Sequence, residues 1–292
     1  MTATVTTAAA LGTSAVDGYY EEQLEIDGVP LRVAVRSGHG RPLLLFNGIG
    51  AHLELLRPFI DALEGVEIII YDMPGIGGSP ATVIPRRFSG LARLSAGLLD
   101  ALGYTRPVNV AGISWGGALA QQFALQYPER SNRLILAATS AGVVAMPAHP
   151  KVLRHMITPR RYIQRGYMRK VAPILYGGEV RARPQLLTRH ANFNLKPSLR
   201  GYFYQLIAGM GWTSAHRLPR LQAPTLLMAG DDDPLMPLVN MRLLDWLIPK
   251  STLHVVRGGG HLFLVLRAHE SAGVIRRFLS ERRHDGTDPQ DY

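Results

Sequence analysis

The sequence predicts an α/β fold: a mostly parallel, eight-stranded sheet with helices on both faces and a helical insertion. Short apolar runs, typical of buried strands, alternate with helix-like segments along most of the 292 residues. This alternation stops after Ser140 and resumes at Pro224, an interval far longer than an ordinary crossover connection. Within the first half of the pattern, Val108 to Tyr127 has the composition of a strand, a tight glycine-rich turn and a helix.

The chain begins with an expected hairpin. Glu22–Asp27 and Leu31–Arg36 alternate in polarity around the turn Asp27-Gly28, which predicts two antiparallel strands at the sheet edge. Apolar runs and helical spacing predict the elements that follow, with Ser89 as the N-cap of the second helix. In order these are strand Pro42–Phe46, helix His52–Leu63, strand Val66–Tyr71, helix Ser89–Leu102, a strand from Val108, helix Gly117–Tyr127 and strand Arg133–Thr139.

The interval after Ser140 is rich in arginine and aromatic residues and carries helical patterns of its own, so we expect a lid. Its expected helices are Lys151–Met156, Arg161–Lys170 and Leu199–Gly209, followed by strand Pro224–Ala229, helix Met236–Leu247, strand Thr252–Val256 and helix Leu262–Leu279. The predicted division is a disordered tail at 1–18, a core at 19–140 and 224–280, a helical lid at 141–223 and a polar tail at 281–292.

Charge is concentrated in the expected lid. The whole chain has a net charge of +10, yet residues 141–223 hold 14 Lys and Arg and a single acid, Glu179. Such a segment is either a solvated helical face or a surface for nucleic acid, anionic surfaces or acidic substrates. No nucleic-acid motif accompanies the charge, so no specific nucleic-acid partner is expected.

The chain contains no cysteine, which excludes disulfides, a thiol nucleophile and cysteine-based metal sites. The N-terminal residues lack the basic and apolar regions of a signal peptide, and no apolar run is long enough to span a membrane. A cytoplasmic location is therefore the expectation. No His, Asp or Glu cluster has metal spacing, and Gly75-Ile-Gly-Gly78 lacks the residues of a phosphate loop, so neither a metal nor a cofactor is expected.

The motif Gly112-Ile-Ser-Trp-Gly116 predicts a serine nucleophile at Ser114. A tight strand-to-helix turn exposes the serine hydroxyl above the sheet edge, and glycine fits where a side chain would collide with neighbouring backbone. The alternative is a purely structural glycine-rich turn that packs a helix on a strand.

A serine hydroxyl needs a base, and the base needs an orienting carboxylate. Asp233 follows the strand that ends near Gly230, although Asp231 and Asp232 are close alternatives and all of them could instead cap the next helix. His261 follows the last strand and its glycine-rich loop, and it completes the order Ser, Asp, His.

A tetrahedral intermediate needs two N–H donors for its oxyanion. The backbone N–H of Trp115 is one candidate. The other is the N–H of Ile49, in the turn after strand Leu43–Phe46, with Asn47 and Gly48 shaping that turn.

These motifs together resemble the α/β-hydrolase fold family from about Gln23 to Leu279. More narrowly, the chain is similar to intracellular depolymerases of medium-chain-length poly(3-hydroxyalkanoate). The stretches that carry this resemblance are 45–51, 112–123, 159–162, 209–214, 229–235 and 260–264. The resemblance implies the triad Ser114, Asp233 and His261, and it includes Asn47 before the oxyanion turn.

The implied reaction is hydrolysis of polyester bonds to 3-hydroxy acids or oligomers through an acyl-enzyme, without a cofactor. A general carboxylesterase or lipase acting on small or glyceride esters, and a catalytically silent binding protein, are the alternatives. Asn47, Trp212 and Tyr176 are expected to contact substrate, although most lid aromatics are expected to pack the lid onto the core. The basic lid raises the hypothesis of docking on a granule with an anionic coat. The lid aromatics are Tyr162, Tyr167, Tyr176, Phe193, Tyr202, Phe203, Tyr204 and Trp212.

Overall fold

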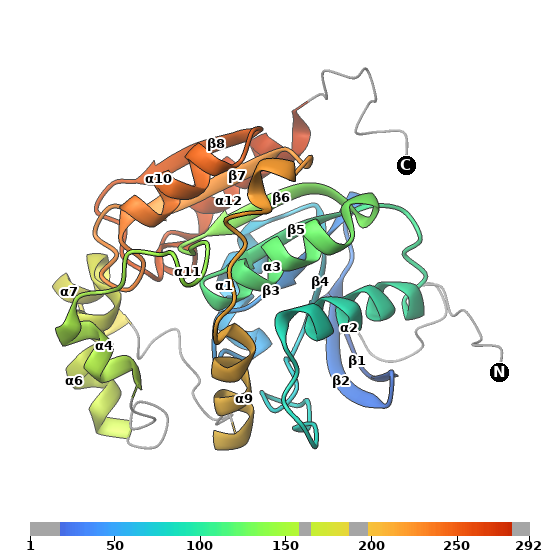
Figure 1. The fold of residues 1–292 in the computed structure, drawn as a ribbon, viewed down its shortest axis with the longest axis horizontal. Helices are drawn as coiled ribbons and strands as arrows, with labels where there is room; N and C mark the ends of the chain where they lie inside the picture. Colours follow the sequence, from blue (N-terminus) through green and yellow to red (C-terminus); the bar gives the residue numbers. More distant parts are fainter. Residues whose placement is uncertain (1–17, 158–164, 187–197, 282–292) are drawn as a thin grey trace.

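The computed structural model describes residues 18–157, 165–186 and 198–281, and Figure 1 shows their path. Eight strands form one sheet, as the sequence predicts, and their order is β1-β2-β4-β3-β5-β6-β7-β8. The expected tails fall almost entirely outside the described residues. The strands are β1 Tyr19–Ile26, β2 Val29–Arg36, β3 His39–Phe46, β4 Val66–Tyr71, β5 Val108–Ile113, β6 Ser131–Ala137, β7 Thr225–Gly230 and β8 Ser251–Val256.

The strands from β4 to β8 are all parallel, and β2 runs antiparallel to both of its neighbours, β1 and β4, so that β1 and β2 form a hairpin at one edge. β6 and β7 are buried along their whole length, which explains their continuous apolar composition. Because the parallel strands point the same way, the residues that follow β3, β5, β7 and β8 meet at one edge of the sheet.

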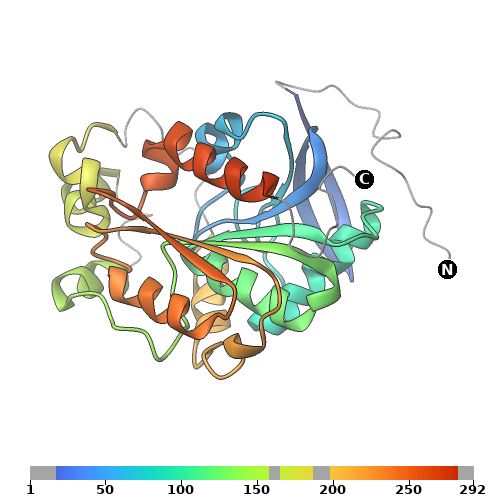
Figure 2. The same ribbon diagram turned by 90° about the horizontal axis from the view of Figure 1, so that it is seen from above.

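Helices cover both faces of the sheet. Figure 2 shows α1 (Arg57–Ala62) and α12 (Ala268–Ser280) on one face, and α2 (Phe88–Ala101), α3 (Trp115–Gln126) and α10 (Leu238–Leu247) on the other. Each face has its own apolar core. Phe59 and Ile275 belong to the first, while Phe123 and Leu244 belong to the second.

Several predicted helix boundaries are wrong. α2 begins at Phe88 with Arg87 as its N-cap, so Ser89 lies inside the helix rather than capping it. The predicted helix His52–Leu63 is divided into a 3₁₀ turn, η2 (Leu53–Leu56), and α1, because Pro58 lacks an N–H and fits only the first turn of a new helix.

The predicted helix Leu262–Leu279 is likewise two helices, α11 (Phe263–Leu266) and α12. The break falls at Arg267, whose guanidinium pairs with Glu179 and donates to the carbonyl of Arg257 at 2.7 Å. The backbone of Arg267 has φ −120° and ψ 49°, outside the helical region, which separates the two helices. The smaller differences are at α3, which starts at Trp115, and at α10, which starts at Leu238.

Four described helices lie between β6 and β7: α4 (Pro150–Ile157), α6 (Arg165–Tyr176), α7 (Gly178–Ala182) and α9 (Leu199–Gly209). α4 and α9 match the sequence prediction closely, α7 was not predicted, and α6 extends six residues past the predicted end at Lys170. The predicted start at Arg161 lies outside the described residues. No helix within 18–157, 165–186 and 198–281 is long and apolar enough to cross a membrane.

Candidate active site

Ser114 sits in a strained turn between β5 and α3. Its backbone has φ 55° and ψ −117°, a region that L residues rarely adopt. The two motif glycines allow this turn. A Cβ on Gly112 would lie 2.2 Å from the carbonyl oxygen of Gly116, and a Cβ on Gly116 would lie 2.3 Å from that of Phe46. The predicted elbow is therefore present, and its serine side chain is only half-buried.

The loop after β7 holds Asp233 in a fixed orientation. Its Oδ1 accepts hydrogen bonds from the backbone N–H groups of Leu235 and Met236, both at 2.9 Å. Its Oδ2 lies 2.8 Å from Nδ1 of His261, and both side chains are buried. This geometry supports the predicted acid and base as a pair, with Asp233 able to hold the His261 tautomer whose Nε2 accepts a proton.

The neighbouring aspartates have other partners. Asp231 accepts a hydrogen bond from the N–H of Gly258 at 2.6 Å, which closes the loop after β8. Asp232 accepts from the N–H of Gly178 at 2.8 Å and forms an ion pair with Arg181. Both bind neighbouring loops, which favours Asp233 over these two alternatives as the carboxylate for His261.

The turn after β3 lies against Ser114. A Cβ on Gly48 would be 3.9 Å from the Cβ of Ser114, so this turn and the elbow are in close contact. Asn47 is buried and holds the turn: its Oδ1 accepts from the N–H of Gly48 at 2.8 Å, and its Nδ2 donates to the carbonyl of His52 at 2.9 Å. Asn47 is therefore engaged with the turn at both ends of its amide, an arrangement that suits positioning better than the predicted substrate contact.

The junction between α6 and α7 packs against both loops of the Asp–His pair. The N–H of His261 donates to the carbonyl of Tyr176 at 2.7 Å. A Cβ on Gly260 would be 2.1 Å from that same oxygen, and one on Gly177 would be 2.1 Å from the carbonyl of Asp232. The Tyr176 ring lies nearly parallel to the His261 imidazole, with 6.3 Å between ring centroids. Tyr176 thus borders the site, and its contact with substrate stays a prediction.

The other aromatic side chains between β6 and β7 divide into packed and exposed groups. Trp212 packs against Phe88, with 5.1 Å between centroids, and its indole N–H donates to Gln122 at 3.0 Å. Tyr202 is buried, whereas Phe203 is 46% exposed. Trp212 therefore fixes its segment to α2 and α3. Tyr162 and Phe193 lie outside the described residues.

A charged network that includes His52 lies next to the turn after β3. Nδ1 of His52 lies 2.5 Å from Glu54, which pairs with Arg32 at 2.6 Å, and Arg32 also contacts Asp72. Burial opposes the charge of Glu54, but hydrogen bonds from His52 and Arg32 outweigh it and lower the Glu54 pKa to about 2. Burial raises the pKa of the Asp72 carboxyl, which accepts from the N–H groups of Gly78 and Leu53.

The sequence profile of the alpha/beta hydrolase fold family matches residues 41–268. The chain belongs to this α/β-hydrolase family. Within the family, the poly(3-hydroxyalkanoate) depolymerase of Ectopseudomonas oleovorans is 53% identical to this hydrolase over 268 residues, which cover 91% of this chain and 94% of that protein. The 2-hydroxy-6-oxononadienedioate/2-hydroxy-6-oxononatrienedioate hydrolase of Burkholderia vietnamiensis is 31% identical over 270 residues, 87% of this chain and 92% of that protein.

Solved structures agree on the fold of the hydrolase. An esterase of Thermogutta terrifontis superposes with a TM-score of 0.73 at 25% identity, covering 89% of this chain and 97% of the other. The enol-lactonase of Burkholderia xenovorans gives a TM-score of 0.75 at 21% identity, covering 89% of this chain and all of the other.

Sequence reasoning missed Gln205. In α9, this side chain is buried, its Oε1 accepts from the N–H of Gly50 at 2.7 Å, and its backbone carbonyl accepts from Nε1 of Trp115 at 2.8 Å. A glutamine on the buried side of a helix has no motif that marks it, so no sequence signal could have found it. Among the described residues, no group of three His, Asp or Glu side chains could hold a metal ion.

Proposed function

We propose that this hydrolase cleaves the ester bonds of poly(3-hydroxyalkanoate), with medium-chain-length polymer as its substrate, by a serine mechanism. The observation that carries the mechanism is the 2.8 Å contact between Oδ2 of Asp233 and Nδ1 of His261, two buried groups that follow β7 and β8. The polymer is proposed because the depolymerase relative is 53% identical across 91% of this chain, a span that must include most of the segment between β6 and β7.

The proposed reaction begins when Nε2 of His261 removes the proton of the Ser114 hydroxyl, while Asp233 stabilises the imidazolium that forms. Ser114 Oγ then attacks the ester carbonyl of a 3-hydroxyacyl unit. The backbone N–H groups of Trp115 and Ile49 hold the oxyanion, a position favoured by the N-terminus of α3. His261 next protonates the leaving hydroxyl and activates a water molecule, which hydrolyses the acyl-enzyme.

We assign the helices between β6 and β7 as a lid over this site. The assignment is supported by the packing of Tyr176–Gly178 on the loops of Asp232 and Gly260, and by the contacts of Gln205 with both oxyanion turns. The lid would admit the polymer along α9, where Phe203 and Leu206 are exposed.

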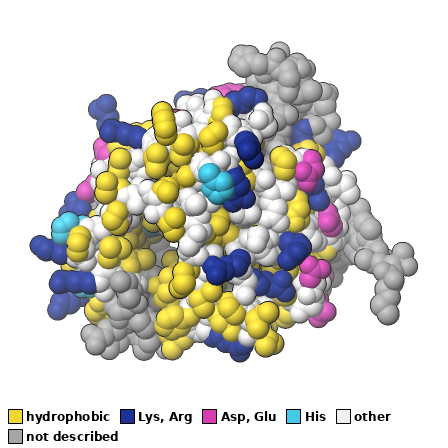
Figure 3. Space-filling view, in the orientation of Figure 1, with side chains coloured by type: hydrophobic (Ala, Val, Ile, Leu, Met, Phe, Trp, Pro, Cys, Tyr) yellow, Lys and Arg dark blue, Asp and Glu magenta, His cyan; other side chains and the backbone are white. Residues whose placement is uncertain are grey.

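The granule surface is the proposed partner of this face, which implies a cytoplasmic, granule-associated enzyme. Hydrophobic side chains gather over α9 and the segment before α2, with Lys and Arg among them (Figure 3). Val83 and Ile84 are 83% and 70% exposed, and Arg200 fixes their loop through a 2.6 Å hydrogen bond to the carbonyl of Val83. An apolar surface rimmed by cations suits a polyester granule with an anionic coat.

Granule binding is tested by sedimentation of the protein with isolated granules at low and at physiological ionic strength. Binding should weaken with salt, because exposed charges are screened within about 8 Å at physiological ionic strength. Replacing both Val83 and Ile84 with serine should weaken it at both salt concentrations. Binding that changes neither with salt nor with the double substitution would refute this docking surface. The proposed catalytic triad would not be affected by that result.

The function itself is tested by offering the purified protein emulsified medium-chain polyester, short-chain polyester and p-nitrophenyl esters, with Ser114→Ala as the blank. Release of 3-hydroxy acids from the medium-chain polymer, absent in the blank, is the expected result. Hydrolysis of the small esters alone would replace the depolymerase with a general carboxylesterase or lipase. No hydrolysis of any substrate would favour a silent binding protein.

A further inference from the structure

The side chain of Gln205 is a buried amide whose oxygen is hydrogen-bonded but whose nitrogen is not. The residue is only 3% exposed, and its Oε1 accepts a 2.7 Å hydrogen bond from the N–H of Gly50. Its Nε2 is buried and has no hydrogen-bond partner within the described part of the chain. Buried donors are nearly always paired in native proteins, so an unpaired one calls for a partner that the protein alone does not supply.

Gln205 lies between the two turns that flank Ser114. Gly50, to which Oε1 is bonded, directly follows Ile49, one of the two proposed oxyanion donors. The backbone carbonyl of Gln205 accepts a 2.8 Å hydrogen bond from the indole N–H of Trp115. The backbone N–H of Trp115 is the second proposed oxyanion donor. These two contacts tie Gln205 to the turn that carries Ile49 and to the side chain of Trp115.

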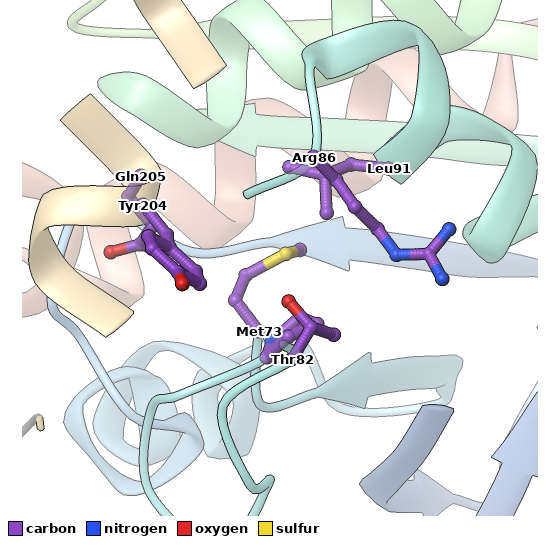
Figure 4. A pocket seen from close by; sticks show the side chains of 7 residues that line it. Met73, Thr82, Arg86, Leu91, Tyr204 and Gln205 are labelled. Atoms are coloured by element: carbon purple, nitrogen blue, oxygen red, sulfur yellow. The ribbon is translucent and has the colours of Figure 1, made fainter. Parts of the chain in front are cut away.

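A small cavity borders this amide. It has a volume of about 20 Å³, enough for one water-sized group, and Figure 4 shows Met73 between the α9 side chains and Leu91. Two of the polar lining groups are already engaged: the Thr82 hydroxyl donates to the carbonyl of Ile84 at 2.7 Å, and the Tyr204 hydroxyl to that of Val83 at 2.9 Å. Besides these groups, the cavity is lined by Met73, Pro74, Arg86, Leu91 and Gln205.

We propose that Nε2 of Gln205 donates a hydrogen bond to the oxygen on the third carbon of the acyl group, and so selects 3-hydroxyacyl esters over plain acyl esters. This inference rests on the proposed polyester function, because every 3-hydroxyacyl unit carries that oxygen two carbons from the reacting carbonyl. The proposal is supported by the anchoring of this amide to Gly50, next to the proposed donor Ile49, and by the unpaired Nε2 at its other end. The cavity at Gln205 has room for one water-sized group, such as this oxygen.

The test compares methyl 3-hydroxyoctanoate with methyl octanoate, each followed by acid release. Gln205→Met removes the amide at similar length, and Gln205→Glu keeps an acceptor for Gly50 but loses the amide donor. Both variants should lose about tenfold more kcat/KM on the 3-hydroxy ester than on the plain ester, mainly through KM, because one hydrogen bond to substrate is lost. Equal losses on the two esters would overturn the proposal and leave Gln205 as a support of the Gly50 turn.

Gln121 provides a matched control. It is also a buried glutamine, but its Nε2 donates to the carbonyls of Gly117 and Ser140 and its Oε1 accepts from Ser214. Gln121→Met should lower the thermal midpoint without altering the ratio between the two esters. A ratio that changes as much as in Gln205→Met would show a general effect of losing a buried amide and refute the specific contact.

A measurement on the unaltered protein tests the same contact if the variants do not fold. 3-Hydroxyoctanoate should inhibit hydrolysis of a plain ester more strongly than octanoate does, and equal inhibition would overturn the proposal. The proposed polymer substrate fails separately: it is refuted when the protein leaves the polyester intact, whatever preference the two methyl esters reveal.

Discussion

The backbone N–H of His261 donates a 2.7 Å hydrogen bond to the carbonyl of Tyr176, the last residue of α6. The proposed base is thus tied through its main chain to the segment between β6 and β7, while its side chain is tied to Asp233. Any movement of the α6–α7 junction must therefore displace the loop that carries His261 or break this bond.

Gly260→Ala should disrupt this attachment. Its Cβ would meet the Tyr176 carbonyl oxygen at 2.1 Å, so backbone must shift on one side or the other. We expect a loss of about 1–4 kcal/mol in the free energy of unfolding and a large loss of kcat. Gly273→Ala, in α12 with no atom within 4 Å of the added Cβ, should instead gain about 0.5–1 kcal/mol with unchanged activity. Denaturant unfolding and ester hydrolysis of both variants measure this, and a harmless Gly260→Ala would contradict the close approach.

Ser114→Gly should separate stability from activity. At φ 55° and ψ −117° the serine backbone is strained, and glycine adopts this region without steric cost. We expect Ser114→Gly to be about 1–2 kcal/mol more stable than Ser114→Ala. Both should lose hydrolysis by at least about 10³-fold. Thermal unfolding of the pair gives the comparison, and equal stabilities would argue that the turn relaxes in solution.

Asp233→Asn should lower kcat by about 10³–10⁴-fold, because the amide cannot hold the His261 tautomer that accepts a proton at Nε2. Asp231→Asn is the matched control, since that side chain accepts a hydrogen bond from the N–H of Gly258 in the loop after β8. It should retain most activity. Kinetics with a p-nitrophenyl ester distinguish the two, and a more severe loss in Asp231→Asn would move the proposed acid to that residue.

Asn47→Ala should weaken the oxyanion turn. The change removes both the acceptor for Gly48 N–H and the donor to His52 carbonyl. We expect kcat to fall by about 10–100-fold with little change in KM, because misplaced N–H donors stabilise the transition state less. The free energy of unfolding should fall by about 1–3 kcal/mol, since buried backbone groups lose partners. A rise in KM alone would support substrate contact by Asn47 instead.

Glu54→Gln should flatten the acid dependence of stability. The Glu54 pKa is lowered from 4.5 to about 2 in the folded protein, so its contribution is complete above pH 4.5 and is lost as pH falls toward 2. Because the carboxylate is 28% exposed, we expect about 1–2 kcal/mol rather than the full value of the shift. The free energy of unfolding, measured with denaturant between pH 4.5 and pH 2, should fall less steeply with decreasing pH in the variant than in the parent protein. Parallel curves would mean that Glu54 is not preferentially charged in the fold.

Local backbone physics made part of this site predictable. A strand, two glycines around a serine and a helix leave few conformations for Ser114, and the glycine-rich loop before His261 follows the last apolar strand. The same reasoning failed where a side chain finds a distant partner. Arg267 lies at the break in a continuous helical pattern, and its partner Glu179 is 88 residues away in sequence.

The sequence by itself determined the alternation of strands and helices, the strained elbow, and the strand ends at which an acid and a base can meet. These depend on periodicity and on glycine, which act over a few residues. Only the tertiary structure decided which of the clustered aspartates faces His261, that Asn47 holds its own turn, and that Gln205 meets Gly50 across 155 residues. Such pairs form only when separate loops are brought to one edge of the sheet, and hydrogen bonds between them leave no repeat in the sequence.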